Sequence, residues 1–325
     1  MTKTRILVLR GGPSDEYDVS MKTGASVLTA LRDSEYDAID VIITRTGEWL
    51  VDGYAKQPHN ILAIADVAFI ALHGAYGEDG TVQRLLDAHG VPYTGSRAYP
   101  SSLAMNKILT KEHLYASPLK MAPHMRVTGD RNTDIARLVH TLIDLLGNEC
   151  VVKPVSGGSS IGTVTTVGPL ELLHALEESL KTRSEILVEK RIRGREATCG
   201  VVERFRNQEL YILPAVEIVP PSSESFFTHT AKYSGVTDEI CPGRFSQAEK
   251  ESIAQHAALV HRTLGLSQYS RSDFIVADDG VYFLEVNTLP GLTSESLMPK
   301  ALDAVGCSHR DFVRHLITDT LVRRR

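Results

Sequence analysis

The stretch Arg271-Ser-Asp-Phe-Ile-Val-Ala-Asp-Asp-Gly-Val-Tyr-Phe-Leu-Glu-Val-Asn287 holds two strand-like runs, one on each side of Asp278-Asp279-Gly280. Asp-Gly between two such runs is a strong signal for a β-hairpin. Large apolar side chains fall on both faces of this hairpin, namely Phe274, Ile275, Phe283 and Leu284. A strand that is apolar on both faces is buried on both, so we expect the hairpin inside the fold.

Four polar side chains stand at the open end of the predicted hairpin. With the turn centred on Asp279, Asp273 pairs with Glu285. The same register pairs Arg271 with Asn287. Alternate residues of a strand point to the same side, so all four side chains are expected on one face.

The two carboxylates of this face need a positive charge between them. Side chains directly opposite lie roughly 5 Å apart, where like charges are destabilising. Asp, Glu and Asn offer oxygen ligands, which favours Mg²⁺ or Mn²⁺ over zinc. Because Mg²⁺ is usually held by one or two carboxylates plus substrate phosphates, the hairpin predicts a bound nucleotide. The alternative is an acidic hairpin end exposed to water, and the apolar faces argue against it.

Length and composition indicate a globular chain of several domains. A chain of 325 residues predicts two or three domains, and the 42% hydrophobic and 23% charged residues are ordinary for such proteins. The net charge of -5, without a basic face, predicts no binding to nucleic acid or membrane. The four cysteines are far apart, and neither a signal-peptide pattern nor a membrane-spanning run is found, so the expected compartment is the cytoplasm.

Residues 1–100 predict an α/β domain with a doubly wound parallel sheet. Strands are expected at 5–10, 39–44 and 67–72, alternating with helices at 19–31 and 81–89. Ligands of such sheets bind beyond the carboxyl ends of the strands, where the Gly-rich loops at 11–14 and 73–80 fall. Glu16 and His73 are the polar candidates in these loops, although either alone would more commonly brace its loop.

The other two predicted domains are a small α+β domain at 101–195 and a strand-rich domain at 196–325. In the first, a Gly/Ser loop at 155–162 follows a strand ending in Lys153, a composition that suits phosphate oxygens but also a flexible hairpin tip. In the second, strands at 196–202 and 210–219 precede a helix with Ser246 and Glu249 as a capping box and Gly265 at its end. One or two helices are expected at 295–322.

Six motifs together resemble the D-alanine–D-alanine ligases of the ATP-grasp superfamily over essentially the whole chain. They are Gly11-Gly-Pro-Ser-Asp-Glu-Tyr-Asp-Val-Ser20, His73-Gly-Ala-Tyr-Gly-Glu-Asp-Gly80, Pro92-Tyr-Thr-Gly95, Lys153-Pro with Gly158-Ser-Ser160, Ala231-Lys-Tyr233 and Glu285-Val-Asn-Thr-Leu-Pro-Gly-Leu-Thr-Ser294. Each motif is weak alone, and their common order is specific. The resemblance implies that a two-lobed ATP-grasp fold follows the N-terminal domain.

The resemblance also implies the binding residues for ATP and metal. The phosphate contacts are implied to come from Lys107, Lys153 and Ser160, and Lys232 is also implied to bind the nucleotide. The adenosine contacts are implied to come from Glu189, Lys190, Ile192, Glu196 and Phe226. The implied ligands of Mg²⁺ or Mn²⁺, two ions per site, are Asp273, Glu285 and Asn287, the set that the hairpin register reached independently.

The amino-acid subsites follow from the same resemblance. Glu16, Ser159 and Tyr233 match the set that orients the first amino acid, and His73 matches a residue near its carboxylate. Arg271 and the Gly291 backbone match the pair that stabilises an oxyanion. Ser296 and Leu297 match the loop that binds the second amino acid.

The implied activity is the ATP-dependent ligation of two D-alanines through an acyl phosphate, for peptidoglycan synthesis, by a homodimer. The chain departs from the family's usual residues at Asn106, at Gly157 and at Phe227-Thr228-His229-Thr230, the expected lid segment. A ligase of D-alanine with D-lactate or D-serine, or another amino-acid ligase of the superfamily, stays an alternative. So does a nucleotide-binding protein without catalysis, which would be expected to lose Arg271 or a metal ligand.

Overall fold

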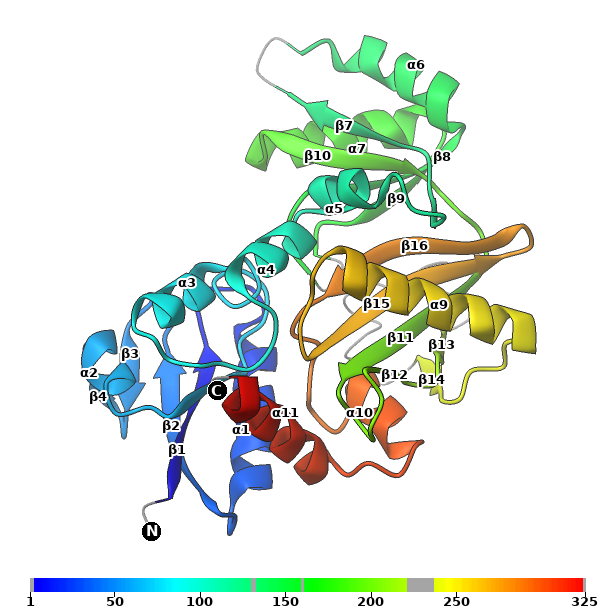
Figure 1. Ribbon diagram of the computed structural model, residues 1–325. Helices are drawn as coiled ribbons and strands as arrows, with labels where there is room; N and C mark the ends of the chain where they lie inside the picture. The colour runs from blue at the N-terminus through cyan, green and yellow to red at the C-terminus, as the bar shows by residue number, and fades with distance from the viewer. Residues whose placement is uncertain (1–2, 130–132, 159–160, 221–236, 324–325) are drawn as a thin grey trace.

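Three β-sheets organise the protein, shown in Figure 1 as a computed structural model that describes residues 3–129, 133–158, 161–220 and 237–323. The strand orders are β4-β3-β2-β1-β5, β7-β10-β8-β9 and β14-β13-β11-β15-β16-β6, with β12 beside β11 in the third sheet. The mixed α/β and α+β fold predicted from the sequence is confirmed.

The N-terminal sheet is parallel at its centre and antiparallel at one edge. Strand β1 (Thr4–Gly11) pairs in parallel with β2 (Tyr36–Ile43) and with β5 (Val67–Ile70), as predicted. The short strands β3 (Trp49–Val51) and β4 (Tyr54–Ala55) add an antiparallel hairpin that was not predicted. The helices of this part are α1 (Tyr17–Leu31), α2 (Pro58–Leu62), α3 (Thr81–Ala88) and α4 (Ala98–Met105).

The last helix of the chain returns to this N-terminal sheet. Helix α10 (Leu297–Asp303) leads to α11 (His309–Arg323), which lies beside α1 in Figure 1. Phe312 and Leu316 of α11 are fully buried in the same apolar cluster as the side chains of β1 and β5. The two ends of the chain therefore share one core, which the sequence did not indicate.

The second sheet is antiparallel and covered by helices on both faces. Its strands are β7 (His124–Thr128), β8 (Glu149–Pro154), β9 (Val164–Val167) and β10 (Glu185–Lys190). The apolar sides of α6 (Ile135–Leu146) and α7 (Pro169–Thr182) pack on one face. On the other face, Ile108 of α5 (Lys107–Leu114) packs against Val155 and Leu187.

The third sheet carries the hairpin. Strand β11 (Arg195–Glu203) pairs with β15 (Tyr269–Ala277), which pairs with β16 (Gly280–Asn287). The predicted strand at 210–219 is two strands, β12 (Leu210–Ile212) and β13 (Val216–Val219), separated by a segment with Pro214, which has no N–H to donate. The remaining elements are β6 (Lys120–Met121), β14 (Asp238–Ile240) and α9 (Gln247–Thr263), whose Ser246–Glu249 capping box is present as predicted.

A β-bulge sets the register at the open end of the hairpin. The turn is tighter than predicted. Ala277 pairs with Gly280, whereas a turn centred on Asp279 would pair Ala277 with Val281. Continued without interruption, that register would set Leu284 opposite Asp273. The pairing shifts between Asp273 and Phe274, so Asp273 does pair with Glu285 as predicted. The bulge thus turns Glu285 to the polar face, a re-aiming of side chains typical of bulges near functional sites.

Candidate active site

One large cavity receives side chains from the second and third sheets and from α1 and the loops of the N-terminal domain. Its volume is about 960 Å³. Every predicted site residue in the described part of the chain lines it: Glu16, His73, Lys107, Lys153, Glu189, Lys190, Ile192, Glu196, Arg271, Asp273, Glu285, Asn287, Gly291, Ser296 and Leu297. The predicted residues Ser159, Ser160, Phe226, Lys232 and Tyr233, and the segment Phe227-Thr228-His229-Thr230, lie outside the described residues.

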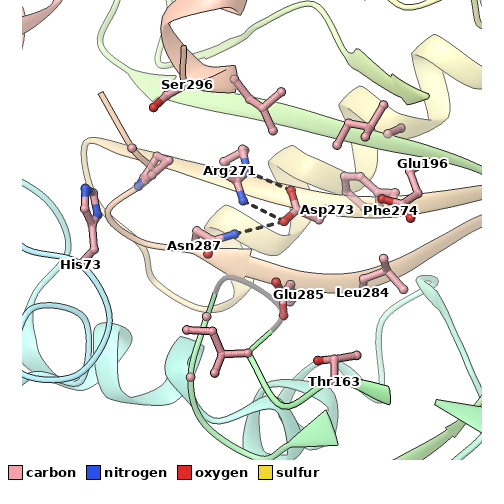
Figure 2. A pocket seen from close by; sticks show the side chains of 18 of the residues that line it. His73, Thr163, Glu196, Arg271, Asp273, Phe274, Leu284, Glu285, Asn287 and Ser296 are labelled. Atoms are coloured by element: carbon pink, nitrogen blue, oxygen red, sulfur yellow. Dashed lines mark hydrogen bonds and ion pairs between the residues drawn. The ribbon is translucent and has the colours of Figure 1, made fainter. Parts of the chain in front are cut away.

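The polar face of the hairpin is a hydrogen-bonded cluster centred on Asp273 (Figure 2). Nε and Nη2 of Arg271 each donate to one carboxylate oxygen of Asp273 at 2.9 Å. Nδ2 of Asn287 donates to the same carboxylate at 3.2 Å, and the Thr198 hydroxyl donates at 2.6 Å. Burial disfavours the charge of Arg271, but the carboxylate of Asp273 outweighs it and raises the pKa of the guanidinium. Arg271 is therefore a fixed cation in the cavity wall.

The predicted metal ligands form a suitable donor set for a hard cation that also binds phosphate. Asp273 and Glu285 supply two carboxylates and Asn287 an amide on one face of the hairpin. Within the described residues, no cluster of three or more His, Cys, Asp or Glu side chains forms a self-sufficient metal site. Two carboxylates and an amide leave several coordination positions for water and phosphate oxygens, as Mg²⁺ prefers.

Lysines from two other elements line the same cavity as this hairpin. Nζ of Lys107, at the start of α5, lies 3.2 Å from a carboxylate oxygen of Glu285 and donates to the Gly157 carbonyl at 2.7 Å. Nζ of Lys153, at the end of β8, lies 2.5 Å from a carboxylate oxygen of Glu189. The loop after β8 approaches the N-terminal loop so closely that a Cβ on Gly158 would meet the Glu16 carboxylate at 2.9 Å. Glycine at 158 therefore lets the two loops meet.

Glu189 is buried between two lysines. Its second carboxylate oxygen lies 2.8 Å from Nζ of Lys111, which is only 1% exposed. Burial opposes ionisation, yet Lys153 and Lys111 lower the pKa of Glu189 to about 2. Burial also lowers the pKa of Lys111 itself, against the attraction of Glu189. Lys111 was not among the predicted site residues, although its spacing of four residues from Lys107 set both on one side of a helix.

The backbone of Leu289 is held on both sides by the 73–80 loop. Nδ1 of His73 donates to the Leu289 carbonyl at 2.9 Å, so Nε2 of the neutral ring accepts from the Thr23 hydroxyl at 2.8 Å. A carboxylate oxygen of Glu78 accepts the Leu289 N–H at 3.0 Å, and the other accepts the Gly74 N–H at 3.0 Å. Burial keeps His73 neutral by lowering its pKa. Both residues therefore act on the backbone of the 288–291 loop, and Glu78 was missed although it lies in a quoted motif.

The second-substrate end lies where β16 leads into α10. A Cβ on Gly291 would meet Oγ of Ser296 at 2.8 Å, so the backbone here approaches the helix start closely. Oγ of Ser296 accepts a hydrogen bond from the N–H of Thr293 at 3.2 Å. It also forms a hydrogen bond with the Thr293 hydroxyl at 2.8 Å. Ser296 precedes the first turn of α10, which fixes its place in the cavity wall.

Two family models cover most of the chain. The model described as "D-ala D-ala ligase C-terminus" matches residues 114–318, and "D-ala D-ala ligase N-terminus" matches residues 5–64 and 53–96. The chain belongs to the D-alanine–D-alanine ligase family.

Relatives in this family match over nearly their full length. A D-alanine–D-alanine ligase of Geobacter sulfurreducens is 40% identical, with 97% of this chain and 93% of the relative covered. That of Desulfotalea psychrophila is 39% identical, with 97% and 94% covered. The predicted family and its enzyme class, ATP-dependent ligase, are confirmed.

Solved structures of the family share the fold. The ATP complex of the Bacillus anthracis D-alanine–D-alanine ligase has a TM-score of 0.80 at 31% identity, with 99% and 98% of the chains covered. The VanG D-Ala:D-Ser ligase of Enterococcus faecalis has a TM-score of 0.83 at 28% identity, with 98% and 100% covered. Since ligases named for different second substrates match almost equally, the fold does not distinguish the second substrate. No helix among the described residues is long and apolar enough to cross a membrane.

Proposed function

We propose that this protein joins two D-alanines into D-alanyl-D-alanine for peptidoglycan synthesis, converting ATP to ADP and phosphate. One observation carries the proposal: Lys107 and Lys153 line the same cavity as the Arg271–Asp273–Asn287 cluster. Phosphate-binding cations and an oxyanion-stabilising cation thus face one reaction space. The relatives named D-alanine–D-alanine ligase, 40% and 39% identical to this chain, support D-alanine as both substrates.

In the first step, the carboxylate of one D-alanine attacks the γ-phosphorus of ATP and releases ADP. Lys107 and Lys153 would bind phosphate oxygens, and Ser160 and Lys232 are proposed to assist. Asp273, Glu285 and Asn287 would hold two Mg²⁺ or Mn²⁺ ions, which would supply positive charge near the transferring phosphoryl group. The adenosine end is assigned to Lys190, Ile192, Glu196, Phe226 and the Glu189 segment.

In the second step, the amine of the other D-alanine attacks the carbonyl carbon of the acyl phosphate. Phosphate leaves and the amine loses a proton, which gives the dipeptide. Arg271 and the Gly291 N–H would stabilise the oxyanion of the tetrahedral intermediate. Glu16, Ser159 and Tyr233 are proposed to orient the first D-alanine, with His73 placing the 288–291 loop. Ser296 and Leu297 are proposed to bind the second.

The proposal includes a homodimer in the cytoplasm and a division into units at 1–100, 101–195 and 196–325. The three sheets follow that division with two exceptions. Strand β6 joins the third sheet although it lies in the middle unit, and α11 packs on the first sheet. Both crossings fit domains that share their interfaces rather than separate modules.

The decisive experiment measures ADP release with Mg-ATP and a panel of D- and L-amino acids and D-lactate, with products identified by mass. Release with D-alanine alone, giving the dipeptide, is the expected result. Release only with D-serine or D-lactate as the second substrate would overturn the substrate assignment and keep the chemistry. ATP binding without release in any combination would overturn the ligase proposal in favour of a non-catalytic nucleotide-binding protein.

A further inference from the structure

A buried lysine stands behind the phosphate side of the cavity without reaching it. Lys111 is 1% exposed and, unlike Lys107 one turn earlier, is not among the residues that line the cavity. Its Nζ lies 2.8 Å from the inner oxygen of Glu189. Nζ of Lys153, which does line the cavity, lies 2.5 Å from the other oxygen. Glu189 is therefore the cavity-lining side chain with which Lys111 forms an ion pair.

The fold fixes this arrangement from two directions. Glu189 pairs with Val151, and Lys153 pairs with Leu187 on the same two antiparallel strands, so both charged side chains occupy one face of the sheet. Helix α5 covers that face, because Ile108 packs against Val155 and Leu187. The helix is also fixed at its start, where the Asn106 side chain accepts the N–H groups of Ile108 and Leu109. Lys111 is thereby presented to Glu189 by a rigid element.

The charges of the three residues explain why two lysines are present. A single lysine paired with a buried carboxylate forms a neutral pair, which offers no net charge to a phosphate. The pair would also hold Lys153 on Glu189, because attraction between charges is strong where water is excluded. With protonated Lys111 beside the inner oxygen, the three residues Lys111, Glu189 and Lys153 together carry one net positive charge. Lys153 is then held less strongly by Glu189 and can bind another anion at a smaller cost.

We propose that Lys111 is a positioning residue for nucleotide phosphates: it shares the carboxylate of Glu189 and so leaves Lys153 available to a phosphate oxygen. The inference rests on the proposed function for the identity of the nucleotide. It assigns Lys111 a role that its burial alone would not suggest. The competing interpretation is a purely structural ion cluster, since buried ion pairs are often replaceable without loss of stability.

The test measures dissociation constants for ATP and adenosine by calorimetry, without amino acids, in the full-length protein. Lys111→Met is expected to raise the dissociation constant for ATP about tenfold relative to that for adenosine. An effect of this size is within the range of coupling energies between contacting residues. Lys111→Arg retains a cation. Its ratio of ATP to adenosine dissociation constants should stay within about threefold of the ratio for the unsubstituted protein. Lys181→Met removes an exposed lysine that pairs with Glu178 and serves as the matched control.

A double-substitution cycle distinguishes positioning from structure. In the Glu189→Gln background, Lys111→Met should change the ATP-to-adenosine ratio less than about twofold, because the carboxylate that Lys111 shares is gone. An equal loss of ATP and adenosine binding in Lys111→Met, or the same loss with and without Glu189, would overturn the inference. If Lys111→Met does not fold, a Lys111→Arg protein that is folded but binds ATP tenfold more weakly relative to adenosine overturns it equally.

This test is independent of the ligation reaction. An unsubstituted protein that binds ATP but joins no amino acids would contradict the proposed function and leave the role of Lys111 intact. If the unsubstituted protein is a ligase and the Lys111→Met variant binds ATP normally, the proposed function stands and the role inferred for Lys111 is wrong.

Discussion

Glu78, in the 73–80 loop, and Glu189, on β10, are two buried carboxylates that line the same cavity, and their pKa values shift in opposite directions. Burial and the charge of Glu16 raise the pKa of Glu78 to about 7, because its hydrogen-bond partners are neutral backbone and hydroxyl groups. Glu189 is at least as buried, yet its two lysines lower its pKa to about 2. Burial alone therefore does not set the charge of a carboxylate here; the charge of its partners does.

The different partners of Glu78 and Glu189 also indicate different roles for the two residues in the site. Glu189 organises cations where nucleotide phosphates are proposed to bind. Glu78 organises backbone, because it joins the 73–80 loop to Leu289, between the proposed metal ligand Asn287 and the proposed oxyanion donor Gly291. Substitutions of the two residues should accordingly fail in different ways.

The largest expected effect is the loss of stability in Glu189→Ala. The change leaves Lys111 and Lys153 facing each other without a counter-charge in a buried site. Breaking a buried ion pair by removing one partner costs about 3–5 kcal/mol. Urea unfolding at pH 7 should show a decrease of that size in the free energy of unfolding. A decrease below about 1 kcal/mol would mean that the two lysines lose their charge freely, and the contrast with Glu78 would fail.

The second prediction is a stability difference that depends on pH. The pKa of Glu78 is raised from 4.5 to about 7 in the fold, so its contribution is fully present below pH 4.5 and is lost as the pH rises through 7. A shift of this size corresponds to roughly 3 kcal/mol. The pKa of Glu189 is lowered to about 2, so its contribution is present above pH 4.5 and is lost as the pH falls towards 2.

Urea unfolding of the unsubstituted protein and of Glu78→Gln between pH 4.5 and 8 checks this sign. Because glutamine does not titrate, the stability of the variant relative to the unsubstituted protein should rise with pH over this window. A flat difference would show that Glu78 is already ionised at pH 4.5, as Glu189 is.

The hairpin shows how far the sequence could predict the site. The Asp-Gly signal located the hairpin, and a turn centred on Asp279 placed Asp273 opposite Glu285; the pairing is confirmed, whereas the turn itself is tighter. The bulge that produces this pairing was not predictable, because it depends on how β16 packs rather than on local preference. The same Asp-Gly pair occurs at Asp52-Gly53 in the β3–β4 hairpin, whose strands, three and two residues long, are too short to show an alternating pattern.

Lys111 and Glu78 escaped prediction for a common reason. A charged residue in a sequence is expected at the surface, and only its partners in space make burial possible. Lys111 finds its partner 78 positions away on β10, and Glu78 finds the Leu289 N–H, 211 positions away in the sequence. Motifs predicted most of the residues that line the cavity, whereas Lys111 and Glu78, which hold other groups in place, required the fold.

The third prediction concerns catalysis more than stability. Glu78→Ala leaves the N–H groups of Gly74 and Leu289 without their carboxylate, which costs about 1–3 kcal/mol for a buried unpaired group. Removal of a desolvated charge offsets part of that loss at pH 7. Because the 288–291 loop loses a fixed point, kcat for dipeptide formation should fall while KM for ATP changes little. Glu177→Ala, an exposed residue of α7, is the control. Equal changes in kcat and KM would assign Glu78 to substrate binding instead.

The smallest effect is expected where a carboxylate has a lysine partner but no burial. Glu178 pairs with Lys181 on α7, and the hydrogen bond from this lysine lowers the pKa of Glu178, as lysines do for Glu189. Both side chains are more than half exposed, so water screens the pair and replaces either partner when it is removed. Glu178→Gln should therefore leave the midpoint of thermal unfolding unchanged within experimental error. A clear decrease in the unfolding midpoint would show that an exposed ion pair also stabilises this protein. The importance of Glu189 would then come from its lysine partners alone and not from its burial beneath α5.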